Sequence, residues 1–127
     1  MRPSVDRWLQ EAREDPSAAH CGMYLIHNGI VRETSRATVR FGDETAPPVT
    51  GMRFDYDEEK VRRAVDETRA MPGIGFVRVW LNRGELKVGE DIMYVLIGGD
   101  IRPHVADALQ FLVGKIKNEC VQETELY

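Results

Sequence analysis

The chain has 127 residues, with 17 lysines and arginines against 21 aspartates and glutamates, so its formal net charge is −4. This length suits one domain, and we expect residues 1–127 to form a single unit. No apolar run approaches the ~20 residues of a membrane-spanning helix, the N-terminus lacks the apolar core of a signal peptide, and two cysteines are too few for a disulfide framework. We therefore expect a cytoplasmic protein that binds neither a membrane nor, given its negative charge, nucleic acid.

Helical and extended patterns alternate in the first half of the chain. Ser4 is placed to cap a helix that ends at Glu14. Residues 22–32 predict a mostly apolar strand that is buried on both faces, and residues 33–48 predict a loop because they contain Gly42, Pro47 and Pro48. Residues 49–56 alternate and predict a strand whose inward side chains are Met52, Phe54 and Tyr56.

The second half predicts two helices on either side of two strands. Asp57 caps the first helix, which closes at residues 71–73. Strands follow at residues 76–81 and 92–97, joined by a tight connection with a brief extended piece. The last helix runs from Arg102 to about Asn118, and its apolar stripe comprises Val105, Leu109, Leu112, Val113 and Ile116. The order αββαββα predicts a single α+β domain with a mainly antiparallel sheet.

One basic cluster stands out among the candidate functional residues. Arg32, Arg36 and Arg40 recur at every fourth position, which places them on one side of either a strand or a helix. Clustered guanidinium groups bind phosphate or carboxylate through paired N–H donors. The alternative is a solvated arginine loop without a ligand. The three histidines and two cysteines show no spacing typical of a metal site.

Lys117 is a second candidate, near the end of the final helix. At ~100° per residue it lies about 85° from the centre of the apolar stripe, so its amine is expected to be partly desolvated and suited to proton transfer. The alternative is structural, because lysines near a helix C-terminus interact favourably with the helix dipole.

In chain order, residues 22–32, 52–56, 84–90 and the final helix form a set that resembles the large, catalytic subunit of molybdopterin synthase. Residues 22–32 resemble its strand motif G-x-V-x-x-F-x-G-x-V-R, and the segments Met52–Tyr56 and Gly84–Glu90 follow in the same order. The final helix resembles the family's H-R-x-x-A-F-x-A stretch and the lysine after it. The resemblance covers residues 20–118 and implies an α/β hammerhead-like fold that forms a homodimer.

The resemblance also implies an activity. A ubiquitin-like small subunit with a C-terminal thiocarboxylate is the implied partner, and sulfur is transferred to cyclic pyranopterin monophosphate to form molybdopterin, without a metal or cofactor. Arg32 and Arg102 match arginines of the family, and Lys117 matches its catalytic lysine. With Arg36, the two arginines are expected to bind anionic groups of the substrate.

The match of Arg102 and Lys117 to family residues requires a dimer, because the two residues lie far apart on one helix. Arg102 and Lys117 are 15 residues apart, or about 22 Å along one helix, so they line one small pocket only if two protomers contribute to it. The chain departs from the family at Ile101, which replaces a histidine, and at Thr124, which replaces a lysine. Residues 118–127 carry three glutamates and no Lys or Arg, where the family is cationic.

Three functions stay open at this point. The first is a molybdopterin synthase-type sulfurtransferase. The second is a catalytically lapsed dimeric module that keeps the pterin- or partner-binding pocket. The third is a dimeric scaffold in which the basic residues only solvate the surface.

Overall fold

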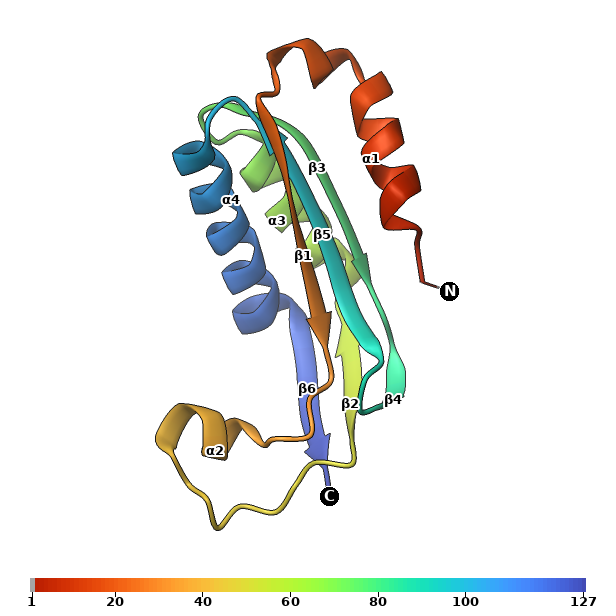
Figure 1. The fold of residues 1–127 in the computed structure, drawn as a ribbon, viewed down its shortest axis with the longest axis vertical. Coiled ribbons are helices and arrows are strands. Elements are labelled where there is room, and N and C mark those ends of the chain that lie inside the picture. The colour runs from red at the N-terminus through yellow and green to blue at the C-terminus, as the bar shows by residue number, and fades with distance from the viewer. Residues whose placement is uncertain (1) are drawn as a thin grey trace.

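The computed structural model describes residues 2–127 and consists of two antiparallel sheets that follow one another along the long axis (Figure 1). The helical segments are α1 (Val5–Glu14), a 3₁₀ helix η1 (Pro16–His20), α2 (Arg36–Phe41), α3 (Glu58–Arg69), α4 (Arg102–Lys115) and a π-helical turn η2 (Ile116–Cys120). The strands are β1 (Met23–Ile30), β2 (Gly51–Tyr56), β3 (Ile74–Leu81), β4 (Gly84–Lys87), β5 (Asp91–Gly99) and β6 (Val121–Leu126).

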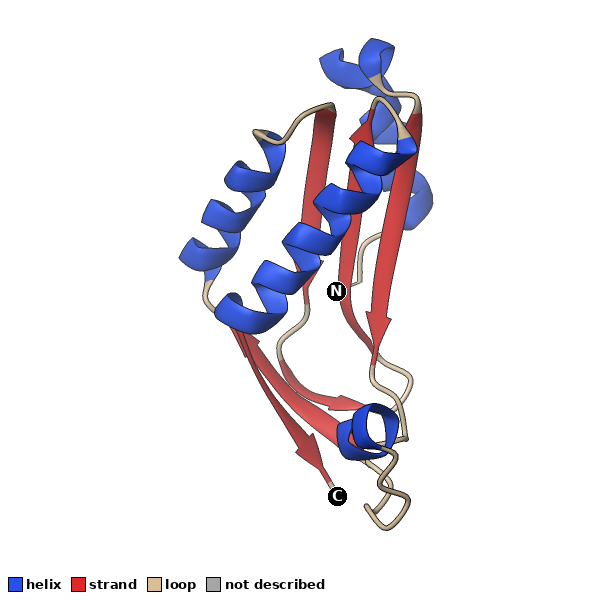
Figure 2. Cartoon of the chain, turned by 90° about the vertical axis from the view of Figure 1, so that its left-hand side faces the viewer, coloured by secondary structure: helices blue, strands red, loops and turns tan. Residues whose placement is uncertain are grey.

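The first sheet has the strand order β1-β5-β3 and lies between helices. Helices α3 and α4 cover one face, and α1 lies on the other (Figures 1 and 2). The central strand β5 is buried from Ile92 to Gly99, as its apolar run predicts. The expectation that the first strand is buried on both faces is wrong. Because β1 forms an edge of the sheet, most of its side chains are only half-buried, and Asn28 and Ile30 are exposed.

The second sheet has the order β4-β2-β6, and in this region the sequence reading missed one strand and one helix. The C-terminal strand β6 pairs antiparallel with β2, with Glu123 opposite Phe54. Helix α2 lies inside the segment 33–48 that was expected to be a loop, and it packs near the C-terminal end of β6 (Figure 1). The predicted α+β class with antiparallel strands is confirmed. The predicted order αββαββα nevertheless lacks α2 and β6, treats β4 only as a brief extended piece, and expects one sheet where the structure has two.

The main core lies between the first sheet and helices α3 and α4 and continues into β2. Phe54, Leu112 and Ile116 are among its largest fully buried side chains. The apolar stripe of α4 faces this core as predicted. The α-helix ends at Lys115 rather than near residue 118, and the chain continues as a π turn before entering β6. Within residues 2–127, no helix has the length and hydropathy needed to cross a bilayer.

Candidate functional site

A cavity of about 220 Å³ lies where the two sheets meet the segment that carries α2. It is lined by six charged residues and by residues that are mostly apolar. The charged residues are Arg32, Arg36, Arg40, Lys117, Glu123 and Glu125. The remaining lining residues are Ile30, Val39, Val49, Met52, Ile92 and Asn118. The cavity thus brings together three of the four predicted site residues, which come from distant parts of the chain.

Helix α2 places two of the arginines because both of its ends are capped. The buried Ser35 is the N-cap, and its Oγ accepts a hydrogen bond from the Thr38 N–H at 3.2 Å. Gly42 ends the helix in the left-handed conformation, with φ of 68°, which glycine adopts without steric cost. Between these caps Arg36 and Arg40 are one helical turn apart, so both reach the cavity.

Backbone hydrogen bonds hold the chain on either side of α2, one to the β4–β5 connection and one between the two flanks themselves. The Val31 N–H donates to the Glu90 carbonyl at 3.0 Å, and the Val49 N–H donates to the Glu33 carbonyl at 2.7 Å. Arg32 lies beside these anchors, and its Nε donates to the Thr34 carbonyl at 2.9 Å. This bond uses one of the five guanidinium N–H donors, so the others are available to a ligand.

Two carboxylates of β6 face the same cavity. The Arg36 guanidinium forms an ion pair with Glu123 at 3.4 Å, and the Arg36 backbone N–H donates to Glu125 at 2.9 Å. Glu125 also accepts from the Tyr127 hydroxyl at 3.1 Å, which raises the pKa of Tyr127. The acidic C-terminal segment noted in the sequence is therefore a wall of the cavity.

Lys117 lines the cavity from the π turn η2, and its side chain is exposed. The partial desolvation expected from α-helical geometry is not found in the single chain, because the π turn replaces the regular 100° step at this point. The ammonium group affects His27 on β1. Burial, with a smaller contribution from Lys117, lowers the pKa of His27. The sequence reading weighed His27 only as a metal ligand; it stands where the resembling strand motif has phenylalanine.

Arg102 lies apart from the other predicted site residues. It is exposed in the first turn of α4, at the opposite end from Lys117, and it does not line the cavity. Nearby, His104 Nδ1 is 2.7 Å from an oxygen of Asp100, and this hydrogen bond lowers the pKa of the Asp100 carboxyl. In one chain, the structure therefore brings Arg32, Arg36 and Lys117 together and leaves Arg102 remote.

Other basic residues that could replace the missing family positions are engaged elsewhere. Arg83 Nε is 2.5 Å from Asp55, and its guanidinium stacks 4.3 Å from the centre of the Tyr56 ring. Lys115 pairs with Glu119 at 3.0 Å, a contact that raises the pKa of the lysine. Neither residue lines the cavity, so its cations are the three arginines and Lys117.

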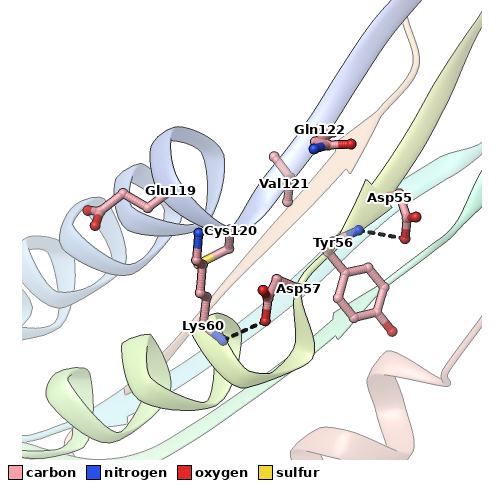
Figure 3. Close-up of a pocket in the computed structure, with 8 residues that line it drawn as sticks. All are labelled: Asp55, Tyr56, Asp57, Lys60, Glu119, Cys120, Val121 and Gln122. Carbon is pink, nitrogen blue, oxygen red and sulfur yellow. Dashed lines mark hydrogen bonds between the residues drawn. The ribbon is translucent and has the colours of Figure 1, made fainter.

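A second cavity, of about 330 Å³, lies beside the start of β6 and contains Cys120 (Figure 3). The Cys120 side chain is buried, and burial raises the pKa of its thiol. The thiol therefore stays protonated at neutral pH and is a poor nucleophile. Asp57 accepts a hydrogen bond from the backbone N–H of Lys60 at 3.1 Å in the same cavity. This contact caps α3, so it has a structural explanation.

The fold is similar to several solved structures. Molybdopterin synthase from Staphylococcus aureus is 15% identical with a TM-score of 0.73, and the match covers 98% of this chain and 85% of that chain. The MoaE protein of molybdopterin biosynthesis from Burkholderia ambifaria is 16% identical with a TM-score of 0.73, covering 99% and 84%. One chain of a complex of subunits 1 and 2 of molybdopterin-converting factor from Helicobacter pylori is 15% identical with a TM-score of 0.64, covering 98% and 84%.

The sequence comparison gives the family. No curated protein matches the chain, whereas the sequence model of the family described as MoaE protein matches residues 3–119. This match spans nearly all of the chain and extends beyond the segments that carry the resemblance seen in the sequence. The chain belongs to the MoaE protein family, whose members act in molybdenum cofactor biosynthesis.

Proposed function

We propose that this protein transfers sulfur from the C-terminal thiocarboxylate of a ubiquitin-like small subunit to cyclic pyranopterin monophosphate, forming molybdopterin. The observation that carries the proposal is the cavity that Lys117, Arg32 and Arg36 line together. A cavity lined by three arginines and a lysine meets the two needs of the reaction. These needs are a site for a phosphate group and a positive charge where negative charge develops.

Arg32 and Arg36 are proposed to bind the substrate's phosphate. A guanidinium group offers paired N–H donors that match phosphate oxygens, and its charge is retained at any pH relevant to a protein. Arg36 is held at the start of a capped helix and Arg32 next to an anchored strand end. Because both backbones are fixed, the two groups lose little conformational freedom when they bind the phosphate.

Lys117 is proposed to act at the carbonyl carbon that bears the sulfur. Its ammonium group stabilises the oxyanion that forms there and transfers a proton during release of the sulfur. Each transfer forms a carbon–sulfur bond on the pterin in place of a carbon–oxygen bond, whose oxygen leaves as a phosphate oxygen or as water. Addition of water then breaks the bond between the carbonyl carbon and the sulfur and leaves a carboxylate on the small subunit.

Arg102 is proposed to complete the cavity of a second protomer. In one chain it lies at the far end of α4 from Lys117, so it has no route to the cavity of its own chain. A homodimer in which the N-terminus of α4 approaches the partner's cavity adds a third arginine to the phosphate site. Mixing Arg102→Ala with Lys117→Ala protein tests this directly, because heterodimers regain one intact cavity. Full inactivity of the mixture contradicts a shared cavity.

The proposed small subunit is consistent with a structural relative. The similar chain from Helicobacter pylori belongs to a complex of subunits 1 and 2 of molybdopterin-converting factor. In the present protein, the exposed side chains of Ile30 and Val39 border the cavity. They provide apolar surface for the C-terminal segment of the small subunit, which would enter the cavity.

The activity assay combines the purified protein, thiocarboxylated small subunit and cyclic pyranopterin monophosphate, and measures dithiolene formation. We expect product with the natural sequence and a loss of at least about 100-fold with Lys117→Ala, the scale of one oxyanion-stabilising group. Lys87→Ala is the control, because Lys87 is an exposed lysine of β4 that does not line the cavity. Equal rates for the two variants contradict the role of Lys117.

A second candidate function is a binding module without turnover. The presence of Glu123 and Glu125 in the cavity favours it, because each carboxylate opposes an anionic substrate. The same assay separates the two functions. Tight binding of the small subunit or the pterin with no dithiolene product supports the binding module and excludes the enzyme.

A further inference from the structure

The arginine cavity already contains an anion from its own chain. The Glu123 carboxylate lies 3.4 Å from the Arg36 guanidinium, and the Glu123 side chain is only 10% exposed. Glu125, two residues further along the same strand, accepts the Arg36 backbone N–H at 2.9 Å. The two carboxylates of β6 thus converge on one arginine, which lines the proposed substrate site.

The pairing of β6 with β2 fixes these carboxylates in place. Glu123 lies opposite Phe54 and Glu125 opposite Met52, and both β2 residues are buried. Alternate residues of a strand face the same side of its sheet, so this register directs both glutamates toward the cavity. Glu123 is therefore part of a paired strand and not of a free tail that drifts past the site.

Glu123 and a bound phosphate require the same donors. The guanidinium group of Arg36 can pair its cavity-facing N–H groups with the carboxylate or with phosphate oxygens. If a phosphate entered while Glu123 stayed in place, two anions would lie within a few ångströms of each other in a partly desolvated cavity. The repulsion between them would oppose binding.

We infer that Glu123 is a specificity-determining residue that occupies Arg36 as an internal competitor, so that a phosphate group binds in the cavity by replacing Glu123 on this arginine. A simple phosphate then binds weakly, because every phosphate must displace the carboxylate. A larger phosphate-bearing ligand overcomes this cost through contacts elsewhere in the cavity. The identity of that ligand as a pterin rests on the proposed function, whereas the competition itself does not.

The test is calorimetric titration of the full-length protein with inorganic phosphate. Glu123→Gln keeps the shape of the side chain but removes its charge, and we expect its Kd for phosphate to be lower by at least about tenfold. Glu85→Gln is the matched control. It makes the same change of net charge and breaks the exposed Arg53–Glu85 pair in the same sheet, outside the cavity. We expect a change of less than about twofold for this control, because salt screens distant charges.

A double-mutant cycle tests whether Arg36 mediates the effect. In an Arg36→Ala background, the gain in phosphate affinity from Glu123→Gln is expected to be clearly smaller than in the natural protein, because the contested donor is absent and only the charge repulsion by Glu123 is relieved. Glu123→Asp provides a second variant if the glutamine variant does not fold. It keeps the charge but shortens the side chain, and it should also bind phosphate more tightly than the natural protein.

Any of four results would overturn the inference. The first two are equal phosphate affinities for the natural protein and Glu123→Gln, and an equal gain with Glu85→Gln. The other two are a gain that persists in full without Arg36, and absence of phosphate binding to every variant. None of these readouts depends on turnover, so failure of the competition is distinguishable from failure of the sulfurtransferase proposal.

Discussion

The cap of α2 allows a quantitative test of how the cavity is built. Ser35 is 1% exposed, and its hydroxyl accepts a hydrogen bond from the Thr38 N–H at 3.2 Å and lies 3.0 Å from the Thr38 hydroxyl. Ser35→Ala removes the cap and leaves a backbone N–H without its partner. We expect it to destabilise α2 by about 1–2 kcal/mol, and Arg36 and Arg40 should lose their fixed positions as the helix opens more often.

Hydrogen exchange measures this opening directly. The Val39 N–H donates to the Ser35 carbonyl in the first turn of α2 and reports on the helix. A loss of 1–2 kcal/mol corresponds to exchange about 5–30 times faster. If global unfolding loses the same free energy, the melting temperature should fall by about 4–8 °C.

Ser4→Ala is the matched control for this prediction. Ser4 is the N-cap of α1, where its Oγ accepts from the Arg7 N–H at 3.3 Å, and α1 does not contribute to the cavity. This variant should lower overall stability without changing Val39 exchange or phosphate affinity. Unchanged Val39 exchange in Ser35→Ala, or equal acceleration in both variants, would refute the assignment of α2 as a capped helix that positions the arginines.

Three further predictions concern stability. Phe54→Ala should reduce the free energy of unfolding by about 3–5 kcal/mol in urea unfolding, because the 1%-exposed ring joins β2 to the core. Gly73→Ala should destabilise the protein, because Gly73 has φ of 78° and an added Cβ would meet neighbouring side chains. Gly114→Ala in α4 adds a Cβ in open space and should stabilise the protein by about 0.5–1 kcal/mol. Equal shifts in the melting temperatures of the two variants would contradict this contrast. Burial lowers the pKa of His27 below 6.5, so the unfolded state binds more protons than the folded state below that pH. The free energy of unfolding should therefore fall as the pH drops through 6.5 toward the folded pKa. The free energy of unfolding of His27→Phe, measured across the same pH range, should lack that loss.

The strongest periodic patterns in the sequence predict the core of the fold. The apolar stripe of α4 and the continuous apolar run of β5 match the buried faces of these elements in the structure. These positions could be predicted because their side chains are apolar for the single reason that they lie in the core. Helix α2 was missed because Gly42 and the two prolines dominated the reading of its segment. The spacing from Ser35 to Gly42, which marks both caps, was the available signal.

Strand β6 was missed for a different physical reason. Its cavity-facing positions are Glu123 and Glu125, so the strand lacks the apolar alternation that indicates burial. Pairing with β2 and contact with Arg36 replace that pattern, and both depend on residues far away in the sequence. The four-residue spacing does predict that Arg36 and Arg40 lie together, but their meeting with Lys117 requires the two sheets to be in place.

The most direct test of sulfur transfer follows the sulfur atom itself. The small subunit is prepared with isotopically labelled sulfur in its thiocarboxylate and mixed with this protein and cyclic pyranopterin monophosphate, and both products are analysed by mass spectrometry. We expect labelled sulfur in the pterin and a carboxylate at the small subunit's C-terminus, with neither change when Lys117→Ala replaces the natural protein. Label that stays on the small subunit, or leaves it without appearing in the pterin, would contradict the proposed function.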